Sequence, residues 1–195
     1  MYHKYQTKGF VLSSVPRGEA NENYILFTKN MGLIHASAQG VRFGKSKLKG
    51  ALDDFKHVEF SLVKGREFWR ITGASEEEGV MPISKKDSLC SFARIASLLR
   101  RLIHGEENND YLYDVIDSGF RMFSSKTDMS FENTKSLEAL MVLKILYAQG
   151  YVKSEGVIEP FVLSSCIKDD DVPLFKKARS KALVAINEAL KQSQL

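Results

Sequence analysis

Short apolar runs alternate with glycine-centred polar breaks through the first 75 residues of the chain. The runs are rich in β-branched and aromatic residues, which favour strands, and the recurring glycines suit a small barrel better than a helical bundle. A turn containing Asn30 and Gly32, two residues that tolerate positive φ, separates the second run from the third. The pattern predicts five strands, over residues 10–15, 24–28, 33–39, 52–63 and 67–72.

The pattern changes after an acidic tract at residues 75–79, beyond which apolar residues recur every three or four positions. This period is typical of helices that bury one face. The third such stretch is apolar over most of its later half, which indicates the buried spine of a helical domain. The pattern predicts helices over residues 84–103, 110–123, 131–149 and 171–190, with an irregular segment over 151–170.

Together the two patterns predict an α+β multidomain chain. Five strands with a basic connection between the third and the fourth match the plan of a five-stranded OB-fold barrel. We assign this barrel to residues 1–79 and an all-helical domain to residues 80–195. Proteins with an OB-fold commonly hold single-stranded nucleic acid on one sheet face and on the loops around it.

Charge singles out residues 40–50, the connection between the third and fourth predicted strands, which we call the basic loop. It contains four cations and no acid: Arg42, Lys45, Lys47 and Lys49. Residues 1–75 hold 12 Lys and Arg against 6 Asp and Glu, so a binding site for a polyanion is expected in this half of the chain. Lys29 and Arg66 extend the positive field. A solvated loop without a ligand is the alternative interpretation.

Aromatic residues in the first half of the chain either fill the core or stack on bases. Strand alternation favours the core for Phe60 and Phe68. Phe43 lies within the basic loop, where a ring has few buried neighbours, and we expect it to contact nucleic acid.

Other chemistries find little support. Gly44-Lys45-Ser46 resembles part of a phosphate-binding P-loop, but three residues rather than four separate Gly40 from Gly44. The four histidines show no metal-ligand spacing, and two cysteines, Cys90 and Cys166, lie in apolar surroundings that favour the core. We therefore expect no catalytic site, no cofactor and no metal.

The remaining features concern the surface and location of the chain. Charged residues in the helical half are expected on the surface, including Arg94, Arg100, Arg101, Arg121 and Lys144. The first residues lack the apolar core of a signal peptide, and no window approaches 18 apolar residues. The sequence thus predicts a soluble, cytoplasmic protein without a membrane partner.

A wider pattern of residues resembles the RecO family of bacterial recombination mediators. In the first domain it consists of Gly9-Phe-Val-Leu, Gly18-Glu19, Thr28, Gly32-Leu-Ile, Gly40-Val-Arg42 and Lys45-Ser46, over about 60 residues. The Leu98-Leu99 helix, residues 109–112 and the segment ending in Gly150-Tyr151 are more loosely similar to that family's helical domain.

The resemblance implies a function in DNA repair and homologous recombination. Members of the family bind single- and double-stranded DNA, anneal complementary strands and assist loading of a recombinase. The partners it implies are RecR and the acidic C-terminal tail of the single-strand-binding protein. By position, the family's DNA-contacting signature falls on Arg42, Lys45 and Ser46.

Three departures from the family pattern matter. Phe43 stands where family members often have a second Arg, and Asn21 stands where they often have an acid. Many members carry a four-cysteine zinc module after the position of Gly150-Tyr151, whereas only Cys166 follows here, so we expect a helical domain without zinc. An adaptor that binds an acidic peptide and an RNA-binding OB module remain alternatives.

Overall fold

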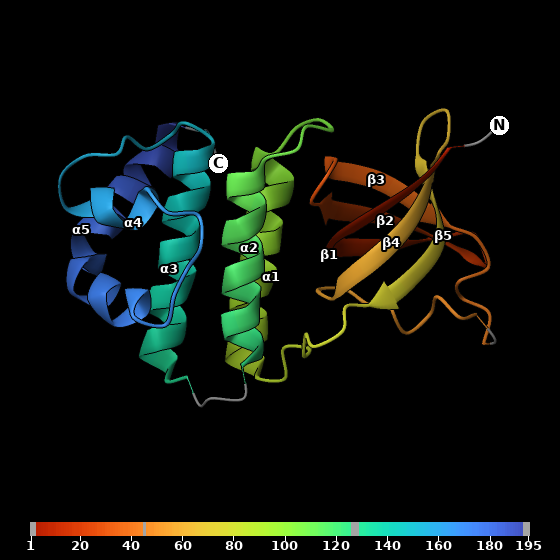
Figure 1. The fold of residues 1–195 in the computed structure, drawn as a ribbon, viewed down its shortest axis with the longest axis horizontal. Coiled ribbons are helices and arrows are strands. Elements are labelled where there is room, and N and C mark those ends of the chain that lie inside the picture. The colour runs from red at the N-terminus through yellow and green to blue at the C-terminus, as the bar shows by residue number, and fades with distance from the viewer. Residues whose placement is uncertain (1–2, 45, 126–128, 193–195) are drawn as a thin grey trace. The chain divides into compact units, whose positions relative to one another are not determined.

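The structure is a computed structural model that describes residues 3–44, 46–125 and 129–192 (Figure 1). Its first part is a closed barrel with the strand order β1-β2-β3-β5-β4, in which β4 pairs with β1. All pairs are antiparallel except β3 with β5, which run parallel. The strands are β1 (Lys4–Arg17), β2 (Asn21–Thr28), β3 (Gly32–Ala38), β4 (His57–Lys64) and β5 (Trp69–Glu76).

Alternating side chains explain the barrel. Leu26 of β2, Ile34 of β3 and Leu62 of β4 point inward and are fully buried, together with further apolar residues of every strand. The first strand is long enough to pair with both β2 and β4, and a register shift between Val11 and Ser13 accommodates its bend. The closed five-stranded barrel confirms the predicted OB-fold.

The first, fourth and fifth strands differ most from their predicted bounds. The first runs over Lys4–Arg17 rather than over residues 10–15. The fourth begins at His57 rather than at residue 52, because residues 40–44 and 46–55 form turns and bends that end against the barrel core. The fifth continues to Glu76 and so takes in the start of the acidic tract. Two acids of that tract are ion-paired rather than merely solvated, Glu76 with Lys56 and Glu77 with Lys8.

The helices follow the predicted pattern. The central one, α3, has buried apolar residues around most of its circumference because it packs against α1, α2 and α5. Its N-cap is Ser130, whose side chain accepts a hydrogen bond from the backbone N–H of Asn133. The helices are α1 (Lys86–Leu102), α2 (Asp110–Ser124), α3 (Phe131–Ala148), α4 (Glu159–Val162) and α5 (Asp171–Gln192).

Several local predictions were wrong. The segment 151–170 is not wholly irregular, because it contains a 3-10 turn, η1 (Gly156–Ile158), followed by α4. Cys90 and Cys166 are exposed rather than in the core. Lys144 is only 2% exposed, because α3 is covered on the side where this lysine lies. An isolated cysteine or lysine does not reveal which face of its helix a neighbour covers.

The chain divides into two compact units. The first contains the residues up to Pro82 together with the α1–α2 connection Ile103–Asn109, and the second contains Ile83–Leu102 and the residues from Asp110 onward. None of the helices in the described ranges is long and apolar enough to cross a membrane.

Candidate nucleic-acid interface

The basic loop is built from successive turns. The backbone N–H of Phe43 donates to the carbonyl of Gly40 at 3.3 Å, that of Ser46 to Phe43 at 3.0 Å, and that of Lys49 to Ser46 at 3.4 Å. Gly40 has a φ of 66°, a left-handed conformation that suits glycine at the point where the chain leaves β3. The loop therefore has a defined path instead of a free one.

Apolar side chains anchor this loop to the barrel. Val41 and Leu52 are buried in the barrel core, and the partly buried Leu48 packs against it. Leu48 lies between Lys47 and Lys49 in the sequence, and both lysines are exposed while Leu48 turns toward the core. The apolar residues thus hold the positive charges at the surface at low entropic cost.

Arg42 is the most constrained of the three loop cations that the structure describes. Its guanidinium Nη1 donates to the carbonyl of Gly18 at 2.9 Å, and its backbone N–H donates to the carbonyl of Ala20 at 3.1 Å. The side-chain oxygen of Asn21 accepts from the N–H of Gly40 at 3.0 Å. These bonds tie the loop to the turn between β1 and β2 and fix one edge of the guanidinium, while the rest of this group remains available to a ligand.

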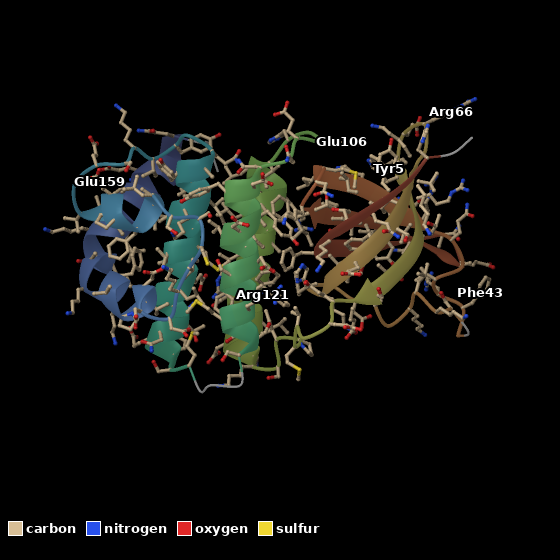
Figure 2. All side chains as sticks on the ribbon, viewed as in Figure 1. Tyr5, Phe43, Arg66, Glu106, Arg121 and Glu159 are labelled. Atoms are coloured by element: carbon tan, nitrogen blue, oxygen red, sulfur yellow. The ribbon has the colours of Figure 1, made fainter. Side chains whose placement is uncertain are left out.

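The other predicted residues of the loop differ in exposure. The ring of Phe43 is 62% exposed, so it is open for stacking, as Figure 2 shows at the edge of the barrel. Ser46 is partly buried and its hydroxyl accepts a hydrogen bond from the N–H of Leu48 at 3.4 Å, which is a turn contact. Lys45 lies outside the described residues.

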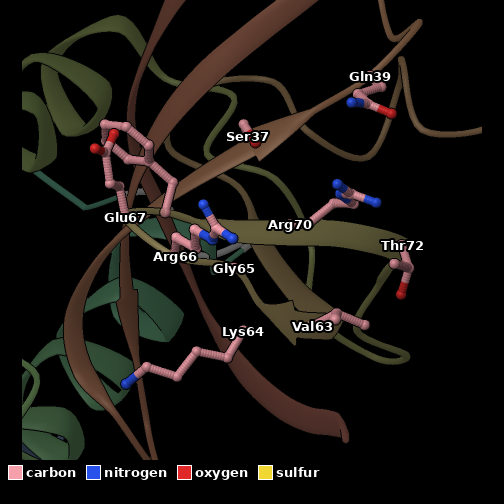
Figure 3. A pocket seen from close by; sticks show the side chains of 10 residues that line it. Ser37, Gln39, Val63, Lys64, Gly65, Arg66, Glu67, Arg70 and Thr72 are labelled. Atoms are coloured by element: carbon pink, nitrogen blue, oxygen red, sulfur yellow. The ribbon is translucent and has the colours of Figure 1, made fainter. Parts of the chain in front are cut away.

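A groove of about 480 Å³ opens beside Arg66 (Figure 3). It exists because β3 and β5 pair only at Ala36 with Trp69 and at Ser37 with Arg70, after which the two strands are not bonded to each other. The β4–β5 hairpin closes one end. The groove is lined by Ser37, Gln39, Val63, Lys64, Gly65, Arg66, Glu67, Phe68, Arg70 and Thr72.

The groove carries more positive than negative charge. Three cations, Lys64, Arg66 and Arg70, accompany a single acid, Glu67. Lys64 is ion-paired with Glu106 at 3.0 Å, whereas within the described ranges neither arginine makes an ion pair or a side-chain hydrogen bond. A phosphate that enters the groove therefore meets two unengaged guanidinium groups.

Phe68 adds an aromatic surface to the groove. It was predicted in the core, but it is 38% exposed, because Trp69 takes the inward position at the start of β5. Arg70 and Lys64 were not predicted as site residues. Strand alternation indicates that Arg70 points outward between the buried Trp69 and Ile71, yet only the fold reveals that it shares a groove with Arg66.

Lys29 lies elsewhere on the barrel. It follows β2 and lines a separate hollow of about 660 Å³ together with Lys8, Asn30 and Glu59. The predicted site residues are thus distributed over three places, namely the basic loop, the groove of Arg66 and the hollow of Lys29. The first two are continuous along the chain, because Gln39 lines the groove and Gly40 starts the loop.

These features define an OB-fold barrel with a cationic, partly aromatic surface, followed by a helical unit. Residues 1–78 match the family described as "Recombination protein O N terminal". Among curated proteins named "DNA repair protein RecO", that of Rubrobacter xylanophilus is 27% identical over 75% of this chain and 58% of the relative. That of Acetivibrio thermocellus is 29% identical over 84% of this chain and 61% of the relative. One of Dehalococcoides mccartyi is 32% identical over 47% of this chain and 36% of the relative.

The first 78 residues therefore belong to the RecO N-terminal domain family, and the chain is a relative of the RecO proteins. The chain spans about half the length of the curated relatives it matches.

Proposed function

We propose that this chain is a mediator of DNA repair and homologous recombination that binds single- and double-stranded DNA through its barrel. The observation that carries the proposal is the groove with its two unengaged guanidinium groups, next to an anchored basic loop on an OB-fold. The curated relatives reported above, each named "DNA repair protein RecO", support the same function.

The mechanism needs no covalent chemistry. Cations of the groove and the loop neutralise phosphates and release counterions, which supplies most of the affinity and makes it dependent on salt. The exposed rings of Phe43 and Phe68 offer stacking surfaces for bases whatever the sequence. Strand annealing follows in this proposal, because neutralised phosphates of two strands repel each other less while their bases stay unpaired. The protein then acts as a non-enzymatic cytoplasmic factor that assists recombinase loading.

Partners are part of the proposal as well. A RecR-like mediator protein and the acidic C-terminal tail of the single-strand-binding protein are the partners that the resemblance implies. Binding of a labelled acidic tail peptide tests the second partner directly. Peptide binding without any DNA binding would instead support an adaptor.

Fluorescence anisotropy of labelled single-stranded DNA at several salt concentrations tests DNA binding. We compare the wild type with Arg66→Ala/Arg70→Ala in the groove and Lys47→Ala/Lys49→Ala in the loop. We expect each double variant to weaken binding for all sequences and to lower the salt slope by about one to two. The loop variant removes no hydrogen bond or ion pair found among the described residues, so its effect reports on charge.

Lys176→Ala/Lys177→Ala in α5 is the matched control, because it removes two exposed cations from the other unit. Affinity and salt slope equal to those of the wild type in both barrel variants would contradict the proposal. A strand-annealing assay with the same proteins then separates a mediator from a passive binder.

A further inference from the structure

A third cavity adjoins the basic loop. It has a volume of about 530 Å³ and is formed by β1, β2 and the loop with the residues that follow it. We call it the mixed-charge cavity, because two cations and three acids line it. Its lining is Ser14, Glu22, Val41, Arg42, Lys49, Leu52, Asp53 and Asp54, none of which lines the groove of Arg66.

Among the described residues, the opposite charges that line this cavity form no ion pair with one another. The guanidinium of Arg42 bonds to the carbonyl of Gly18, and Asp53 pairs at 3.3 Å with Lys56, which is not in the lining. Among the residues that the structure describes, Lys49 and Asp54 have no side-chain hydrogen bond or ion pair. Both a cationic and an anionic group are therefore free to meet a ligand.

The third acid is held in place by a tyrosine. The hydroxyl of the buried Tyr24 donates to Oε2 of Glu22 at 2.6 Å. Burial raises the pKa of Tyr24, and Glu22, Asp54 and Asp53 raise it further, so the hydroxyl stays protonated as a donor. One oxygen of Glu22 is thus engaged, and the acceptors left are the carboxylate of Asp54 and the Oδ1 oxygen of Asp53, whose Oδ2 faces Lys56.

We propose that the mixed-charge cavity binds a nucleotide whose base carries an exocyclic amino group, with its phosphate at Arg42 and Lys49 and its amino group at Asp53 and Asp54. A carboxylate accepts the N–H of cytosine N4, as in contacts of acidic side chains with DNA bases. Thymine has no amino group, and its one ring donor, N3–H, lies between two carbonyl oxygens that a carboxylate repels. This inference rests on the proposed DNA binding and adds a base preference to it.

The test compares oligo(dC) with oligo(dT) of equal length by anisotropy, at a slightly alkaline pH that keeps cytosine N3 unprotonated. These two strands share the same backbone charge and both carry pyrimidines, so their difference reports on base edges. We expect the wild type to bind oligo(dC) about fivefold or more tightly, the low end for one good base contact. Asp54→Asn and Asp53→Asn/Asp54→Asn should reduce this preference by weakening oligo(dC) binding alone.

Glu78→Gln is the control for Asp54→Asn, because it removes one exposed acid of the same unit that lines neither cavity. Asp54→Asn should fold as the wild type does, because this side chain has no hydrogen-bond or ion-pair partner among the described residues. Equal binding of both oligomers by the wild type would overturn the inference while leaving DNA binding intact. An equal gain of affinity for both oligomers in Asp54→Asn and Glu78→Gln would overturn it too, because the carboxylates would then only repel phosphate. Failure to bind either oligomer overturns the proposed function and this inference together.

Discussion

The carboxylate of Glu106 accepts a hydrogen bond from the indole Nε1 of Trp69 at 2.9 Å. Its other oxygen accepts from the ammonium of Lys64 at 3.0 Å, and that ammonium lies 5.1 Å from the centre of the Trp69 ring. Lys64 ends β4 and Trp69 begins β5, so Glu106 fastens the α1–α2 connection to the hairpin that closes the groove.

Replacement of Glu106 by Gln should destabilise the first unit by about 1 kcal/mol. The charge-assisted bonds to Lys64 and Trp69 become weaker, but the pair is partly exposed and water screens it. Trp69 is the single tryptophan of the chain, so its fluorescence in a urea titration follows the barrel. Glu107→Gln, a neighbouring exposed acid, should leave the midpoint unchanged. An equal shift in both variants would mean that only net charge matters.

The contact of Glu106 with Lys64 and Trp69 predicts that the stability of the barrel depends on pH. Burial by itself would raise the pKa of Glu106, but hydrogen bonds from Lys64 and Trp69 outweigh it, and the pKa lies below its ordinary value. A carboxyl with a lowered folded pKa contributes stability above its unfolded pKa and loses it as the pH falls through the folded pKa. Wild-type barrel stability should therefore fall more than that of Glu106→Gln between pH values of about 5 and 3. Parallel pH curves for the two proteins would contradict this.

Gly32→Ala should destabilise the first unit more than Gly18→Ala. Both glycines have positive φ, 62° and 65°, so an alanine at either position costs about 1 kcal/mol of backbone strain. A Cβ on Gly32 would also lie 2.1 Å from the carbonyl oxygen of Glu107, whereas a Cβ on Gly18 meets nothing within 4 Å. The difference between the two urea midpoints isolates this clash. Equal midpoints would mean that the α1–α2 connection is not in close contact with the β2–β3 turn.

The sequence allowed prediction of what depends on local pattern. Alternation located the strands, and the basic loop was visible because its charges are consecutive. The inward position of Trp69 and the outward position of Arg70 follow the same rule, although Phe68 shows that it is unreliable next to a turn.

Features made by distant segments were not predictable in this way. The groove depends on a parallel pairing of only two residue pairs between β3 and β5. The contact of Glu106 with Trp69 joins residues 37 positions apart, and no periodicity marks it. The mixed-charge cavity brings Glu22 together with Asp53 and Asp54, acids that the sequence places on separate elements.

In the second unit, Glu138→Gln should lower stability by about 1–3 kcal/mol. Glu138 of α3 accepts bonds from Arg94 and Ser91 of α1, from the latter at 2.8 Å, and from Lys135 at 3.1 Å. Burial would raise its pKa, but these donors hold it below the ordinary value. The far-UV circular dichroism of the helices in urea measures the change. Glu188→Gln, an exposed acid of α5, is the control. A loss no larger than that of the control would show that this network adds nothing to helix packing.

Replacement of the buried Lys144 by Met should be neutral or should stabilise the second unit. The ammonium donates to the carbonyl of Ser164 at 2.5 Å, but no carboxylate bonds to it among the described residues, and burial lowers its pKa. An apolar side chain of similar length avoids the desolvation of a charge, and the exposed Ser164 can bond to water instead.

The pH dependence of stability distinguishes the removal of a desolvated charge from better packing as the cause. Because the folded state holds the Lys144 proton less tightly than the unfolded state, the wild type gains stability as the pH rises from the folded pKa toward the ordinary value of 10.5. Lys144→Met lacks this gain, so the difference between the two proteins in urea should shrink as the solution becomes alkaline. Lys153 is an exposed lysine of the same unit, and the stability of Lys153→Met should change with pH in parallel with that of the wild type. A clear loss of stability in Lys144→Met at neutral pH would instead mean that the bond to Ser164 outweighs the cost of burying the charge.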